Sequence, residues 1–278
     1  FMGRGIVATQ EDFGAQGEAP THQGLLDWLA VEFVESGWSM KHIHRLIVTS
    51  RIYRQSSRVS GEHLEQDPAN RYFARSPRVR MSAEMVRDSA LAASGLLAHR
   101  MHGPPIYPPQ PNGIWRHVGR NAPKFVAAKD ENRFRRGVYV VWRRGAPYAS
   151  FVNFDAPDRG ACVVARPRTN TPLQALTLLN GNVFLEASQA LGRWAVDQKG
   201  SEANVAKAMF QRCLTRPPDS KEQNLMMNFY RTQLARFQKG EAEAEPLAGK
   251  GEGDVNHRAA WTALARVLLN TDEFITRN

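Results

Sequence analysis

The last third of the chain carries a series of helix start signals, and these constrain its fold more than any other feature. Thr171-Pro172-Leu173-Gln174 combines a capping box with proline at the first helical position. Asp219, followed three residues later by Glu222, is a second N-cap signal. A mobile loop rich in glycine and charged residues is expected at 240–253. The helices predicted in this part span 172–180, 183–198, 202–214, 220–239 and 255–269.

The first hundred residues contain three further segments with a helical pattern. Leu25 and Leu29 belong to the broad apolar face of the first segment, and Gly37 ends it. Ser39 and Ser82 are credible N-caps for the second and third. The short connection at Gly37 makes the first two helices neighbours in an αα-hairpin. The predicted helices span 24–36, 40–53 and 83–98.

The middle of the chain has a different pattern. Five prolines between positions 104 and 111 break regular structure there. Gly137–Trp142 is rich in β-branched and aromatic residues, and Ser150–Phe154 is expected to pair with it through a turn at 145–147. The predicted fold class is therefore mainly α: a multi-helix domain with a small β-hairpin insertion in the middle of the chain.

The length of 278 residues suits one large domain with a hydrophobic core. A hydrophobic fraction of 42% excludes collagen-like and wholly disordered classes. Because the chain begins at Phe1 without a signal-peptide pattern, we expect one domain over 1–278 that is the C-terminal fragment of a larger protein. Its expected subdivision is 1–98 helical, 99–168 irregular with the β-hairpin, and 169–278 helical.

The chain has a formal net charge of +10, and the excess lies in the middle. Residues 41–144 carry 20 basic and seven acidic side chains, a net charge of +13. Such a segment could meet nucleic acid, an anionic polysaccharide or an acidic partner domain. We expect no nucleic acid, because acidic residues are interleaved and no recognition motif is present. We also expect no transmembrane segment, because no run of about 18 apolar residues occurs.

Several strings along the chain resemble one known family, the planctomycete-specific domain family (PSD-one type). This is a domain of unknown function that usually follows a second uncharacterised domain and often a planctomycete-type cytochrome c domain. One departure is His22-Gln23-Gly24, where the family tends to read His-Pro-Glu. The strings that carry the resemblance include Phe1-Met2-Gly3-Arg4-Gly5-Ile6-Val7, Gly37-Trp38-Ser39-Met40-Lys41, Asp67-Pro68-Ala69-Asn70-Arg71, Phe154-Asp155-Ala156-Pro157-Asp158 and Thr169-Asn170-Thr171-Pro172-Leu173-Gln174.

The resemblance implies a parent protein that is exported and periplasmic or associated with the cell envelope. It implies partner domains N-terminal to this piece, and it supplies no catalytic mechanism. No CxxCH haem-attachment motif occurs in the 278 residues, so we expect no cofactor within this chain. Haem c is expected in a separate domain of the parent protein.

Asp12, His22 and Asp27 are the best candidates for a polar site in the first part of the chain. Their side chains could bind a divalent cation. Asp12 and His22 together with Asp155 are candidate catalytic residues, with His22 as a general base. The alternative is structural: Asp12 caps a turn, His22 ties the loop to the following helix, and Asp155 belongs to an Asp-x-Pro turn.

A second candidate site is an arrangement of acids and arginines that could bind an anion or a sugar acid. The alternative is a structural ion-pair network that holds a long loop on the core. The candidate ligand-binding residues are Arg78, Arg80, Arg87, Asp88, Arg135 and Arg136.

Functional motifs narrow the reaction classes. No P-loop, GxGxxG, GxSxG or HExxH motif is present, which argues against the commonest nucleotide-binding, hydrolase and zinc-protease classes. Cys162 and Cys213 could pair, but two buried free thiols are favoured.

The leading hypothesis is an accessory module in envelope or extracellular polymer handling, linked to a cytochrome-c-type partner domain. The alternative is a hydrolase or redox enzyme acting on a polysaccharide, sulfated ones included, with an Asp/His site.

Overall fold

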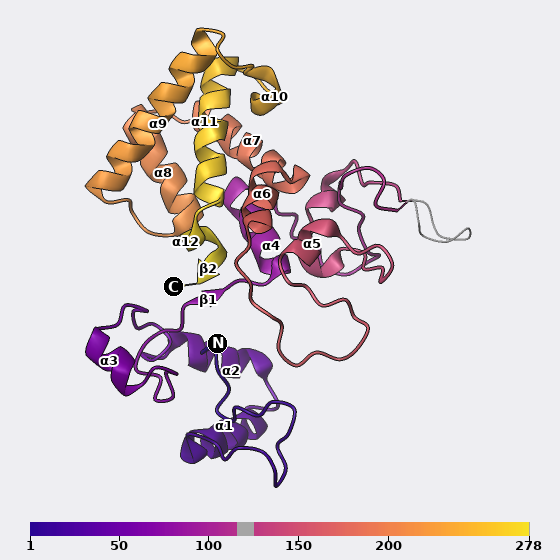
Figure 1. Ribbon diagram of the computed structural model, residues 1–278, viewed down its shortest axis with the longest axis vertical. Helices are drawn as coiled ribbons and strands as arrows, with labels where there is room; N and C mark the ends of the chain where they lie inside the picture. Colours follow the sequence, from indigo (N-terminus) through magenta and orange to yellow (C-terminus); the bar gives the residue numbers. More distant parts are fainter. Residues whose placement is uncertain (116–124, 278) are drawn as a thin grey trace. The chain divides into compact units, whose positions relative to one another are not determined.

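The computed structural model describes residues 1–115 and 125–277 and is drawn in Figure 1. It divides into two compact units. The first consists of Phe1–Arg80 with Thr276–Asn278, and the second of Met81–Ile275. The division after Arg80 differs from the expected boundaries at 98 and 168, because one hydrophobic core runs from Ala83 to Ile275.

The first unit contains a helical hairpin, a short helix and a two-stranded antiparallel sheet. The chain reverses in the hairpin at Gly37 and Trp38, which have φ angles of 71° and 62°. Ser39 caps the second helix by accepting a hydrogen bond from the His42 N–H at 3.3 Å. The predicted hairpin is therefore confirmed. The elements are α1 (Gln23–Glu35), α2 (Met40–Thr49), α3 (Gly61–Gln66), β1 (Val79–Arg80) and β2 (Thr276–Arg277).

The second unit is a set of helices packed around α7 and α11. Gly192 on α7 lies directly against Thr262 on α11, so the two helix backbones approach closely. Helix α9 also packs on α11, where Tyr230 stacks on Trp261 with 3.9 Å between ring centroids. The helices are α4 (Ala83–Ser94), α5 (Ala149–Asn153), α6 (Pro172–Asn180), α7 (Asn182–Val196), α8 (Glu202–Leu214), α9 (Ser220–Gln238), α10 (Glu245–Ala248), α11 (Val255–Leu269) and α12 (Asp272–Ile275), with 3-10 turns η1 (Glu131–Phe134) and η2 (Gly137–Tyr139).

The helices of the last third begin where the start signals predict them. The Thr171 side chain accepts from the Gln174 N–H at the start of α6. Asp219 and Glu222 form a reciprocal capping box at the start of α9, with both hydrogen bonds at 2.8 Å. Their observed ends lie within two residues of the predicted ones. The prediction of a mainly α fold is confirmed.

The predicted location of the β-hairpin is wrong. Residues 137–139 form the 3-10 turn η2, and Ala149–Asn153 forms helix α5. Val140 makes only an isolated parallel bridge with Ile106, through hydrogen bonds of 2.8 and 2.9 Å. The flanking prolines lack N–H groups, so a longer ladder cannot form there. The named strands of the described residues are β1 and β2 instead, which join residues far apart in sequence.

The expected mobile loop at 240–253 contains helix α10 and is fastened from inside. Arg258, only 6% exposed, donates through one nitrogen to the carbonyl oxygens of Gly251, Glu252 and Gly253 at 2.6–2.8 Å. One guanidinium thus satisfies several carbonyl groups of irregular backbone.

A second arginine ties the start of α9 to α12. Arg216 donates to both carboxylate oxygens of Glu222 at 2.6–2.8 Å and to both of Glu273 at 2.7 Å. The hydrogen bonds from Arg216 lower the pKa of Glu222 from 4.5 to about 2, more than the desolvation of the carboxylate raises it.

Both cysteines are free thiols. Cys213 is buried on α8, whereas Cys162 is exposed in the loop before α6. The expectation of two buried thiols is therefore right for Cys213 and wrong for Cys162. Burial raises the pKa of Cys213 to about 12.

Candidate functional site

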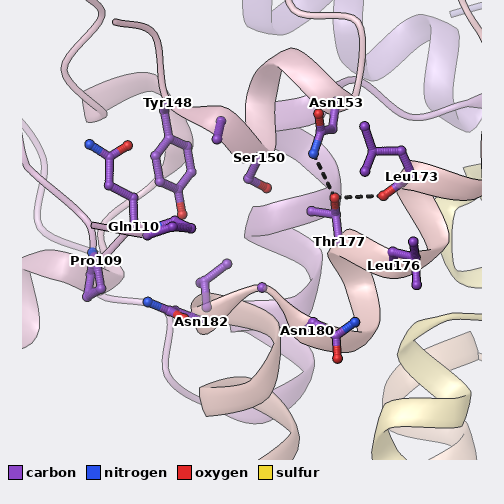
Figure 2. A pocket seen from close by; sticks show the side chains of 14 residues that line it. Pro109, Gln110, Tyr148, Ser150, Asn153, Leu173, Leu176, Thr177, Asn180 and Asn182 are labelled. Atoms are coloured by element: carbon purple, nitrogen blue, oxygen red, sulfur yellow. Dashed lines mark hydrogen bonds between the residues drawn. The ribbon is translucent and has the colours of Figure 1, made fainter. Parts of the chain in front are cut away.

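The second unit contains a cavity of about 260 Å³ between α5, α6, the start of α7 and the proline-rich segment 109–111. Figure 2 shows Gln110 and Tyr148 on one side of this cavity and Asn153 and Thr177 on the other. Its volume is just below the range of about 300–1,000 Å³ that is typical of small-molecule sites. All its lining residues belong to one unit, so the cavity is a property of that unit alone.

Asn153 and Thr177 form a fixed polar wall. The Asn153 Nδ2 donates to the Thr177 Oγ1 at 2.8 Å, and that hydroxyl donates to the Leu173 carbonyl oxygen at 2.8 Å (Figure 2). Both groups are oriented by these bonds, and the first of them joins α5 to α6. The amide oxygen of Asn153 makes no hydrogen bond within the described residues and remains available as an acceptor.

The floor of the cavity is the junction between α6 and α7. Gly181 ends α6 and is at the same time the N-cap residue of α7, without a side-chain cap. The backbone N–H groups of Asn182 and Val183 therefore have no acceptor among the described residues. Because Gly181, Asn182 and Val183 all line the cavity, two backbone donors are available at its floor.

Tyr148 closes one side and connects the cavity to buried charges. The residue is 6% exposed, and the guanidinium of Arg87 is close enough to lower the pKa of its hydroxyl group. Burial raises the pKa of Tyr148, and Arg87 only partly offsets this effect, so the hydroxyl remains neutral. Tyr148 thus presents a fixed, uncharged wall.

Arg87 is held from behind by the backbone. It donates to the carbonyl oxygen of Arg135 at 2.7 Å and to that of Arg133 at 2.6 Å. Desolvation lowers the pKa of Arg87, while Tyr148 and Asp88 raise it. Burial likewise raises the pKa of Asp88, which the Gly137 N–H opposes by donating to its carboxylate at 2.7 Å.

Gln110 has an unsatisfied acceptor behind the wall of the cavity. Its Oε1 atom is buried and has no hydrogen-bond partner within the described residues. A buried acceptor without a partner costs free energy of about 1–3 kcal/mol. Because protein atoms cover this oxygen, it does not face the cavity.

The surface of the lining is mostly apolar, and its polar groups are uncharged. It combines side-chain amides, hydroxyl groups and backbone donors, and Leu173 and Leu176, each 53% exposed, add an apolar edge. The lining residues within 1–115 and 125–277 include no carboxylate, lysine, arginine or histidine. The cavity is therefore suited to hydrogen-bond a neutral polar ligand that also has apolar surface.

Comparison with known proteins decides the family. The family model described as PSD1, protein of unknown function (DUF1553), matches residues 1–230. The chain belongs to the PSD1 family. No curated protein and no solved structure matches the chain. The match includes every residue that lines the cavity of this PSD1 member and ends within α9, so α11 lies beyond it.

A helix that spans a membrane must be both long and apolar, and the described helices of this PSD1 member differ from that. Within residues 1–115 and 125–277, none is both long and apolar enough to cross a bilayer.

The residues expected to hold a metal all lie in the first unit, in separate structural roles. Asp12 is exposed and accepts from the Gly14 N–H at 2.9 Å. His22 stacks on Phe73 with 5.0 Å between ring centroids, and Asp27 accepts from Gln23 at 2.7 Å. The described part of the chain contains no group of three or more His, Cys, Asp or Glu side chains that could hold a metal ion.

Asp155, the third expected catalytic residue, lies in the second unit of this PSD1 member, whereas Asp12 and His22 lie in the first. Its carboxylate accepts from the N–H and the hydroxyl group of Thr169 at 2.7–3.0 Å. It therefore positions the segment that leads into α6. The catalytic role of these three residues stays a prediction.

The expected ligand-binding arginines are also divided between the units. Arg78 and Arg80 belong to the first unit, and Arg87, Asp88, Arg135 and Arg136 to the second. Arg135 is 2% exposed, donates to the carbonyl oxygens of Arg100, His102 and Pro104, and stacks on Tyr139 at 3.9 Å. Arg136 lies 3.9 Å from Asp88. In the second unit, Arg87 and Arg135 thus bond the chain itself, and the ligand-binding role of the set stays a prediction.

The polar residues of the cavity were not singled out from the sequence of this PSD1 member. Gln110, Asn153 and Thr177 are neutral residues from three separate segments, and no spacing rule relates them. One local signal was available: Asn180-Gly181-Asn182 separates two helices, so the second must begin with free N–H groups.

Proposed function

We propose that this chain is an accessory module of an exported, envelope-associated protein, and that its cavity binds a sugar unit of an envelope or extracellular polymer. Partner domains of the same parent protein would lie N-terminal to it, among them a cytochrome-c-type domain that carries haem c. The resemblance to the family supports the setting, and the cavity supports the binding role.

The observation that carries the proposal is the mixture of groups around the cavity. A sugar hydroxyl group both donates and accepts, and side-chain amides such as those of Asn153 and Asn182 offer both partners. The C–H faces of a sugar ring are apolar and suit the exposed leucines of α6. Because Asn153 and Thr177 are fixed by their own hydrogen bonds, the wall is pre-organised and little side-chain entropy is lost on binding.

The lining favours a neutral sugar over a sulfated one. Among the residues that the structure describes, no cationic side chain lines the cavity, and the buried Arg87 and Arg135 are bonded to carbonyl oxygens of the chain itself. The lining also favours binding over hydrolysis, since glycoside hydrolysis generally uses a pair of carboxyl groups about 5–10 Å apart. An anionic polysaccharide therefore remains the competing ligand, to be separated by experiment.

Calorimetric titration of the chain with neutral oligosaccharides, at 50 and 500 mM NaCl, tests the proposal. We expect binding of at least one neutral oligosaccharide, with an affinity that changes less than twofold between the two salt concentrations. Asn153→Ala should weaken it by about tenfold, the value of one buried hydrogen-bonding group. Asn228→Ala, at an exposed position on α9, is the matched control and should leave the affinity unchanged.

Two results would overturn the proposal. One is the absence of binding to every neutral oligosaccharide by a chain whose circular dichroism shows it to be folded. The other is binding of sulfated glycans alone, with an affinity that falls steeply with salt, because that dependence marks an electrostatic site elsewhere on the surface.

A further inference from the structure

We propose that the exposed side of helix α1 is a docking surface for a helix of a partner protein whose apolar stripe is flanked by lysine or arginine. This surface, called the α1 face, consists of Trp28, Val31 and Val34 together with Asp27 and Glu35. It lies in the first unit, so the proposal does not depend on the cavity or on its ligand.

The first unit encloses very little core of its own. Within 1–80, all of which the structure describes, the buried residues are Asn70, Phe73 and Ser76, and Phe73 is the one hydrophobic residue among them. In the second unit, α11 alone has nine buried residues. A segment of about 80 residues normally needs a hydrophobic core to hold its fold. The first unit therefore keeps apolar surface in water that a partner could cover.

One side of α1 faces α2, as expected for a helical hairpin. Leu25, Leu29 and Phe33 share this side and are half-buried. Close to them, the Glu32 carboxylate lies 2.5 Å from the Nε2 atom of His42 on α2, which joins the two helices. These residues make up the apolar stripe that one neighbouring helix requires.

The opposite side of α1 is also apolar, yet it is exposed. Trp28, Val31 and Val34 repeat every three residues there and are 50%, 53% and 51% exposed. The outer side of a surface helix normally carries polar side chains, and a helix that is apolar all round is normally buried. Tryptophan is also one of the residue types that contribute most to protein interfaces. The sequence of α1 is thus that of a helix covered on both sides.

The charges on the α1 face indicate the chemistry of the partner. Asp27 lies about one helical turn before Val31, and Glu35 lies about one turn after it. The sequence of α1 has no lysine or arginine, and residues 1–40 carry six acidic side chains against one basic. Charges of opposite sign around an apolar contact speed association and select its register. The complement is a helix with an apolar stripe and basic residues about two turns apart.

Two other occupants fit these charges less well. In a pair of two-fold related copies, the acidic residues of one α1 face would meet those of the other and repel them. Helices that lie on a membrane surface generally carry lysine and arginine, which meet anionic lipids, whereas α1 carries acidic residues only. We therefore treat self-association and membrane binding as outcomes of the test.

Two helical peptides of about 20 residues serve as probes for such a partner. Both have a leucine stripe on an alanine-rich background, and they differ only in the residues that flank the stripe, which are lysines in one and glutamates in the other. Fluorescence anisotropy with the whole chain at 50 mM NaCl should give an affinity at least tenfold higher for the lysine peptide. Raising the salt to 500 mM should weaken its binding at least threefold, because salt screens exposed charges.

Trp28→Ala tests whether the peptide binds at the α1 face. We expect it to lower the affinity for the lysine peptide at least tenfold, because a central tryptophan supplies a large share of the binding energy of an interface. Phe13→Ala, at an aromatic residue 75% exposed and outside α1, is the matched control and should change the affinity less than twofold.

A charge swap tests the chemistry of the partner. The double variant with Asp27→Lys and Glu35→Lys should reverse the preference, so that the glutamate peptide binds more tightly than the lysine peptide. The matched control carries Glu62→Lys and Glu65→Lys, at exposed positions on α3, and should keep the preference for the lysine peptide. Circular dichroism verifies that each variant is folded.

Several results would overturn the proposal. Failure of the lysine peptide to bind, an unchanged affinity in Trp28→Ala, or an unchanged preference in the charge-swapped variant would each do so. Dimerisation of the chain that Trp28→Ala abolishes, or binding to phosphatidylglycerol vesicles through Trp28, would assign the α1 face to another occupant. None of these results bears on sugar binding in the cavity, so the two proposals can fail separately.

Discussion

Replacing Arg87 by lysine tests whether the buried arginines of the second unit stabilise the fold by donating hydrogen bonds to the chain's own backbone. Arg87 is fully buried, and its guanidinium donates to two carbonyl oxygens at 2.6 and 2.7 Å. A lysine has one nitrogen on a flexible stem and reaches only one of these two oxygens well. A charge-assisted hydrogen bond contributes about 1.5–3 kcal/mol. We therefore expect Arg87→Lys to lower the free energy of unfolding by about 2–3 kcal/mol.

The assay is urea denaturation followed by circular dichroism, with the free-energy change taken from the shift in midpoint. Arg87→Met removes both bonds and should cost more, about 3–5 kcal/mol, because it leaves two buried carbonyl groups unpaired. The control is Arg231→Lys, at a side chain 66% exposed and 3.9 Å from Glu202, where we expect less than about 0.5 kcal/mol. An effect of Arg87→Lys no larger than that of the control would refute the reasoning.

Three further predictions concern pH, thiol reactivity and helix packing. The lowered pKa of Glu222 stabilises the fold above the unfolded pKa of 4.5, and this contribution is lost as the pH falls toward about 2. The difference in urea midpoint between wild type and E222Q should therefore be full at pH 7 and shrink between pH 4.5 and 2. A difference that stays constant over this pH range would contradict the prediction. In the native protein at pH 8, a thiol reagent should modify Cys162 within minutes and Cys213 only on unfolding. The reason is that Cys213 is buried and its pKa is raised to about 12. Rapid modification of both thiols would argue against the burial of Cys213 on α8. Gly192→Ala should lower stability by about 1–3 kcal/mol, because the added methyl group meets Thr262; an unchanged or raised melting temperature would show that α7 and α11 are not in close contact.

The helices of the last third could be predicted because their ends depend on local chemistry. Thr171 and Asp219 satisfy the first N–H groups of α6 and α9 wherever the rest of the chain lies. Gly95 ends α4 in a left-handed conformation, four residues before the predicted end. A glycine is a common helix stop, so this end also follows from local chemistry, although the prediction placed it later.

The β-hairpin could not be predicted correctly, because β-propensity mainly reflects how a side chain is buried. Phe151 and Phe154 are both buried, and their spacing of three residues places them on one face of a helix. Val152, between them, is 47% exposed, which fits that same helical face pattern. The aromatic composition suggested a strand, whereas the spacing of these two rings favours the helix that forms.

Only the floor of the candidate site, at the start of α7, could be predicted from the sequence. The glycine between Asn180 and Asn182 marks a helix start with free donors, and this follows from the sequence. The meeting of Gln110 with Asn153 depends on how segment 109–111 packs against α5, which is a tertiary contact without a sequence spacing. Charged residues such as Arg87 and Asp155 were the predicted site residues, yet both form hydrogen bonds with other residues of the chain.

Binding of a neutral sugar in the cavity between α5, α6 and α7 is tested most directly by NMR of the side-chain amides. In ¹H–¹⁵N spectra, addition of a neutral oligosaccharide should shift the side-chain NH₂ signals of Gln110, Asn153 and Asn182 in a saturable way. Those of Asn224 and Asn228, exposed on α9, should not move. Unmoved cavity signals at saturating oligosaccharide, or shifts confined to residues outside the cavity, would contradict the claim.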